Sequence, residues 1–149
     1  MKKIFKTSWA LIAMMLVFSV SCAGSKGQQA VDMIADAFND MAKEVEKCTS
    51  INDLENLDFS GIGMKTGADD IDDSCKDYEL TSADKSKLKK SFHNFYDAVV
   101  DKMVDFMGGL ISRDDLEKQM DAMLTVYNNA VDNSDTLGDY VKALDNLNF

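Results

Sequence analysis

The feature of this chain that most restricts its fold is the helical spacing of its apolar residues. Between Gln28 and Thr49, six apolar side chains recur at intervals of three or four residues: Val31, Ile34, Phe38, Met41, Val45 and Cys48. This spacing places all six on one side of an α-helix and leaves most charged residues on the other sides. Because an isolated helix is marginal in water, its apolar side must pack against other helices.

The same spacing predicts further helices, and a Ser or Thr followed three residues later by Asp marks where they begin. Such capping boxes occur at residues 50–53, 81–84 and 112–115. In each, the first side chain accepts a hydrogen bond from the backbone N–H three residues on. They predict a short helix near 54–57 and long helices over 82–107 and 113–132, and a final helix carries apolar residues from 137 to 147.

These elements predict an all-α fold, an antiparallel bundle of about four amphipathic helices plus one short helix. Gly108 and Gly109 are expected to end the second long helix, and the short link that follows makes the second and third long helices a hairpin. The chain contains no proline, which turn-rich β domains usually include. Glycines at 61, 63 and 67 predict a long irregular connection over 58–78, with an acidic loop at 68–79.

The N-terminal segment has the three parts of a secretory signal peptide. Lys2, Lys3 and Lys6 give it a positive start, residues 9–20 are almost wholly apolar, and small residues follow from Ser21. The apolar stretch is short for a permanent span, because a hydrocarbon core of ~30 Å requires about 20 residues of helix. An uncleaved membrane anchor remains the alternative.

The residues Ser19-Val20-Ser21-Cys22 resemble the lipobox of bacterial lipoproteins, in which the cysteine becomes the lipid-modified N-terminus. Ser19 departs from the usual leucine, as in the relaxed lipoboxes of Bacteroidetes-type lipoproteins. The resemblance covers the first 22 residues only. It implies a signal peptide over 1–21 and a lipidated Cys22. The small residues that follow predict a tether over 22–27, and the helical spacing predicts one domain over 28–149.

Two locations follow from the two ways of cleaving the signal peptide. Lipidation at Cys22 would hold the protein in the cell envelope, at the outer membrane or a periplasmic face, because several acyl chains give stable anchoring. Cleavage after Ala23 would instead release a secreted or periplasmic soluble protein. Either cleavage removes three lysines and no acids.

The charge of the processed chain excludes one class of partner. The formal net charge is −10 for the whole chain and becomes −13 when the three lysines of the signal peptide are lost. A domain this acidic repels phosphate backbones, so we expect no nucleic-acid binding. Anionic lipids are equally disfavoured, and membrane attachment would come from the lipid anchor alone.

Cys48 and Cys75 are the cysteines left once Cys22 is lipidated or removed. Two thiols in an exported chain predict a disulfide, which would fasten the acidic loop to the end of the first helix. The alternative is a buried free thiol at Cys48 and an exposed one at Cys75.

No pattern in the sequence indicates a catalytic, metal or cofactor site. The acidic loop lacks the central glycine and distal glutamate of a calcium-binding loop. The methionines fall on the predicted apolar sides, where they fill gaps in a core. His93, the one histidine, has no adjacent nucleophile. We therefore expect no enzymatic activity, no cofactor and no metal ligands.

The remaining hypotheses are two kinds of binding. The first is a non-enzymatic lipoprotein whose helical domain binds another envelope protein or supports an envelope assembly. The alternative is a carrier that holds a small apolar ligand between its helices. Its cavity would be lined by aromatic residues of the predicted apolar sides: Phe38, Phe92, Phe95, Tyr96, Phe106 and Tyr127.

Removal of the signal peptide has a simple optical consequence. Trp9 is the one tryptophan of the chain and lies in the segment expected to be cleaved. The protein isolated from its own host should therefore show tyrosine fluorescence and no tryptophan emission. Intact mass should place the new N-terminus at Cys22 with added acyl groups. Tryptophan emission from the isolated protein would contradict cleavage.

Overall fold

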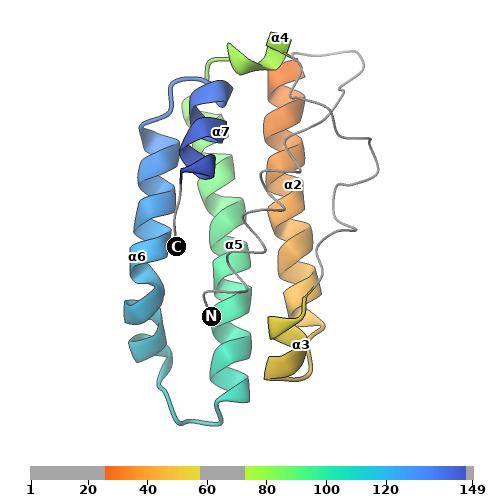
Figure 1. Ribbon diagram of the computed structural model, residues 1–149, viewed down its shortest axis with the longest axis vertical. Coiled ribbons are helices and arrows are strands. Elements are labelled where there is room, and N and C mark those ends of the chain that lie inside the picture. Colours follow the sequence, from red (N-terminus) through yellow and green to blue (C-terminus); the bar gives the residue numbers. More distant parts are fainter. Residues whose placement is uncertain (1–25, 58–72, 147–149) are drawn as a thin grey trace.

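The protein is built from helices over the residues described by the computed structural model, 26–57 and 73–146 (Figure 1). The predicted all-α class is therefore confirmed. In chain order the helices are α2 (Lys26–Glu46), α3 (Ile51–Glu55), α4 (Asp73–Lys76), α5 (Ser82–Phe106), α6 (Arg113–Asp132) and α7 (Leu137–Asp145). None of these helices combines the length and the apolar character that a membrane span requires.

The helices begin where the polar caps are. In four of them the N-cap hydroxyl accepts a hydrogen bond from the backbone N–H three residues on: Ser50 in α3, Thr81 in α5, Ser112 in α6 and Thr136 in α7. The first three are the predicted starts. The cap at Thr136 was not predicted, because Gly138 suggested a weak first turn. At the other end of α5, Gly108 and Gly109 have φ angles of 56° and 84°, as predicted for a helix that ends in glycine.

The first two long helices run parallel, and here the predicted antiparallel bundle is wrong. Three hydrogen bonds join side chains of α5 to residues 54 or 55 positions earlier: Lys87 to Asp32, Asn94 to Asn39 and Lys102 to the Cys48 carbonyl. Residue numbers therefore rise together along both helices. The physical reason is that α4, which precedes α5, lies beside the start of α2 (Figure 1), so α5 begins at the same end of the bundle as α2.

The predicted hairpin of α5 and α6 is confirmed. The Tyr96 hydroxyl lies 3.4 Å from the Glu117 carbonyl oxygen, and the Tyr127 hydroxyl lies 3.3 Å from that of Leu88. Residue numbers on α6 therefore fall as those on α5 rise, which makes the pair antiparallel. α7 then packs against α6 at the same end of the bundle as α4 (Figure 1).

The predicted apolar sides form one core. All six residues of the α2 pattern are buried, as are Leu88, Phe92, Phe95, Val99 and Met103 of α5. Phe106, in the last turn of α5, is only partly buried. Tyr127 of α6 and Tyr140 of α7 are fully enclosed and joined by a hydrogen bond of 2.9 Å between their hydroxyl oxygens. This bond satisfies two polar groups that would otherwise be costly to bury.

One buried carboxylate joins the starts of α2 and α5. Asp84 is 2% exposed, and its Oδ2 atom accepts hydrogen bonds from the Thr81 N–H (2.9 Å), the Thr81 hydroxyl (2.7 Å) and the Tyr78 hydroxyl (2.9 Å). The Tyr78 hydroxyl also lies 2.9 Å from Oε1 of Gln28 in α2. The ring of Tyr78 covers Gly27 so closely that a Cβ atom there would lie 2.1 Å from a ring carbon. The first turn of α2 is thus fixed to the start of α5.

We predict that Asp84→Asn lowers the free energy of unfolding by about 1–2 kcal/mol, the usual cost of losing a helix cap. Burial raises the pKa of Asp84, and the hydrogen bonds from Thr81 and Tyr78 lower it by more, so the net shift is downward. The ionised form therefore stabilises the fold at pH values above the unfolded pKa of about 3.9, and this contribution is lost as the pH falls through the lower, folded pKa.

The matched control is Asp139→Asn, which alters the same capping position in α7, where the residue is exposed. Urea unfolding at pH 7 and at lower pH measures both variants. We expect the larger loss, and the loss of acid dependence, at Asp84. Equal losses at the two positions would contradict a special role for the buried joint.

Candidate functional site

A surface groove of about 780 Å³ lies between α2 and α5. The groove follows the contact between the two helices, because their parallel packing places residues 36–46 of α2 beside residues 94–101 of α5. The Asn94 amide donates to the side-chain oxygen of Asn39 (2.9 Å), which ties the walls together. Ala42 and Ala98 also line the groove, and these small side chains leave it open.

The groove is strongly acidic. Five carboxylates line it: Asp36, Asp40, Glu46, Asp97 and Asp101. Lys43 is the basic residue of the lining, and its Nζ atom lies 2.7 Å from Oδ1 of Asp40. The hydrogen bond and charge of Asp40 raise the pKa of Lys43, so this lysine stays protonated. The lining as a whole therefore presents excess negative charge to any molecule that enters it.

Arg113, the first residue of α6, borders the α5 wall of the groove. Its guanidinium forms an ion pair with Asp101, lies 3.8 Å from a carboxylate oxygen of Asp97 and donates to Glu117 at 2.5 Å. The hydrogen bond that Arg113 donates to Glu117, together with the charge of Asp101, raises the pKa of Arg113. His93 lies 3.4 Å from the other oxygen of Asp97 and stacks on Tyr96. The one histidine is therefore an exposed neighbour of this ion-pair cluster.

Two further hollows lie on the surface. One of about 400 Å³ runs between α6 and α7 and includes Val126 and Ala130, and one of about 340 Å³ lies beside α3 and includes Cys48 and Leu57. Among the described residues, no three or more of the His, Cys, Asp and Glu side chains converge in a way that would hold a metal ion.

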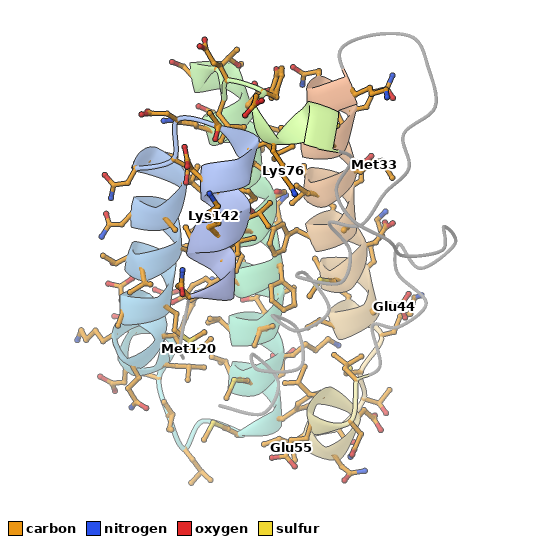
Figure 2. All side chains as sticks on the ribbon, turned by 45° about the horizontal axis from the view of Figure 1, so that its top comes forward. Met33, Glu44, Glu55, Lys76, Met120 and Lys142 are labelled. Carbon is orange, nitrogen blue, oxygen red and sulfur yellow. The ribbon has the colours of Figure 1, made fainter. Side chains whose placement is uncertain are left out.

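The predicted disulfide between Cys48 and Cys75 is not formed, and both residues are buried free thiols. The reason is the separation of the two cysteines along α2. Cys75 lies in α4, next to the Tyr78 ring that covers the start of α2 at Gly27, whereas Cys48 follows the other end of that helix. A rise of 1.5 Å per residue puts these ends about 30 Å apart, whereas a disulfide needs Cα atoms within about 7 Å. Figure 2 shows Lys76 of α4 and Glu55 of α3 at opposite ends of the bundle.

The other predicted site residues have different outcomes. Cys22 and residues 68–72 of the acidic loop lie outside the described residues. Of the rest of that loop, Asp77 and Glu79 are exposed, and the backbone of Glu79 pairs with that of Thr136 at the start of α7. The segment that follows α4 is therefore paired through its backbone with the start of α7.

Four of the six aromatic residues proposed to line a ligand cavity pack against one another. The ring of Phe38 lies 5.3 Å from that of Phe92, 6.5 Å from that of Phe95 and 5.8 Å from that of Tyr127. Phe92 and Tyr127 are stacked at 3.9 Å. These rings occupy the space between the helices, and none of them lines the three surface hollows. This packing favours a filled core.

The acidic groove was missed in the sequence, although one signal was present. Asp36 and Asp40 lie one turn apart on α2, and Asp97 and Asp101 lie one turn apart on α5. Each pair makes an acidic row along its own helix. Only the parallel pairing brings the two rows to the same groove.

Comparison with protein-family models, with curated proteins and with solved structures finds no match to this chain.

The free thiols give a direct test of the structure. Burial raises the pKa of the Cys48 thiol, which lowers its reactivity further. We expect Cys48 and Cys75 to resist alkylation by iodoacetamide in the native protein and to react when it is unfolded in urea without any reductant. Peptide mapping assigns the modified residues. Alkylation that required prior reduction would contradict the free thiols.

Proposed function

We propose that this chain is an exported lipoprotein, anchored in the cell envelope through Cys22, whose helical domain is a non-catalytic module that binds another envelope protein. The observation that carries the binding role is the acidic groove between α2 and α5. Its carboxylates stand on two long helices that share a core. Such a surface is ready for a partner without rearrangement, which lowers the cost of association.

The charge of the groove indicates what it would bind. Complementary charge raises the rate of encounter and rejects partners of the wrong sign. A segment rich in Lys or Arg meets five lining carboxylates, and Lys43 is already paired with Asp40. The proposed occupant is therefore a basic segment of a neighbouring envelope protein.

The anchoring role is supported by the sequence before α2. Residues 23–25 separate the lipobox-like Cys22 from Lys26, where α2 begins. Three residues span at most about 10 Å. Because Tyr78 covers Gly27 and lies against Gln28, the first turn of α2 is held in the domain. A lipid on Cys22 would therefore keep this end of the bundle close to the membrane.

The groove can be tested by charge reversal. We expect the double variant Asp36→Lys/Glu46→Lys to lose its partner in affinity purification from solubilised envelopes at native expression, because two of the five lining carboxylates become cations. High salt should weaken the wild-type complex as well, since exposed charges are screened.

The matched control is Asp121→Lys, an exposed acidic residue of α6 outside the groove, which should retain the partner. Circular dichroism checks that all variants are folded. If no partner is recovered reproducibly with the wild-type chain, the binding role is wrong. If the groove variant retains the partner, the interaction lies elsewhere on the domain.

A further inference from the structure

Two exposed apolar side chains lie at the end of the bundle opposite the start of α2. Leu110, in the link between α5 and α6, is 87% exposed, and Ile51, the first residue of α3, is 47% exposed. Figure 1 shows this link and α3 at the same end of the molecule. We call the link 108–111 together with Ile51 the distal tip. The third large exposed apolar residue among those described, Val126 at 42%, lies on α6 in a different hollow.

The exposure of Leu110 is fixed by the backbone of the link. The Gly108 N–H donates to the Asp105 carbonyl (3.4 Å) and the Leu110 N–H donates to the Met107 carbonyl (3.0 Å). Positive φ angles at Gly108 and Gly109 turn the chain, and the Ser112 cap starts α6 directly afterwards. The hydrogen-bonded turn thus holds Leu110 at the surface, and its side chain does not pack in the core.

Ion pairs join the chain next to the distal tip to two residues of the acidic groove. Arg113 follows Leu110 by three residues and pairs with Asp101 and Asp97, which both line the groove. On the α3 side, Lys102 donates to the Cys48 carbonyl at 3.0 Å, which ties the chain leading to α3 against α5. Two residues that line the groove therefore pair with a residue close to the tip, and two basic side chains at this end, Lys102 and Arg113, are engaged within the domain.

The charge around the tip selects among possible occupants. Exposed carboxylates stand at the same end: Glu55 in α3, Asp105 in the last turn of α5 and Asp114 in the first turn of α6. A second copy of this chain would bring like charges together, and an anionic lipid surface would be repelled. A basic segment that also carries apolar side chains would match both the apolar tip and the carboxylates around it.

We propose that the groove and the distal tip form one docking surface for a basic segment of another envelope protein, with cationic side chains in the groove and apolar side chains against Leu110 and Ile51. This inference rests on the proposed binding function and names its surface and the chemistry of the partner. Because α2 begins at the opposite end of the bundle, a lipid on Cys22, four residues before Lys26, would leave the tip facing away from the anchoring membrane.

The test uses the full-length chain, expressed at its native level in its own host, with a photo-crosslinking phenylalanine analogue at one position at a time. The positions are 110 in the tip, 43 in the groove and 126 as the exposed apolar control. We expect adducts of the same mass, with the same partner protein, at 110 and 43, and none at 126. The crosslinked partner peptide should contain Lys or Arg together with apolar residues.

A second substitution tests whether tip and groove act together. In the chain that carries the crosslinker at 43, Leu110→Ser should reduce the adduct about tenfold, because the apolar contact at the tip is lost. Val126→Ser should leave it unchanged. Leu110 is exposed, so its replacement should not affect the thermal unfolding midpoint.

The outcomes separate this inference from the proposed function. An adduct at 43 that is insensitive to Leu110→Ser, or different partners at 43 and 110, would overturn the shared surface and leave the binding function standing. A lipid adduct or a doubled chain mass at 110 would replace the proposed occupant with a membrane or a second copy. No adduct at either position would overturn both.

Discussion

The structure depends on the parallel packing of α2 against α5. Phe38 of α2 inserts among rings from two other helices, at 5.3 Å from Phe92 of α5 and 5.8 Å from Tyr127 of α6. This contact buries the apolar side of α2 and sets its register against α5. The hydrogen bond between Asn94 and Asn39 at the surface follows the same register. Large buried rings contribute much of the apolar area that stabilises a small domain.

The same register also produces the acidic groove. Because the parallel packing places the acidic row of α2 beside the acidic row of α5, each row forms one wall of the groove. An antiparallel pairing would have placed different residues opposite each other. The packing that stabilises the fold therefore also brings five carboxylates together along one groove.

The two ends of the bundle are built differently. At one end, the buried carboxylate of Asp84 and the ring of Tyr78 join the starts of α2 and α5. At the other end, Leu110 is held outward on a turn shaped by two glycines. One end is thus closed by polar contacts within the domain, whereas the other presents apolar surface to the outside.

The sequence by itself determined the local structure: the helical class, the caps at Ser50, Thr81 and Ser112, the glycine end of α5 and the apolar side of α2. These features depend on neighbours within a few residues. The direction of α2 relative to α5 depends on where the connecting chain travels, and no local pattern encodes that path. The tertiary structure alone therefore decided that the helices are parallel, that Cys48 and Cys75 stand too far apart to pair, and that four aspartates from two helices share one groove.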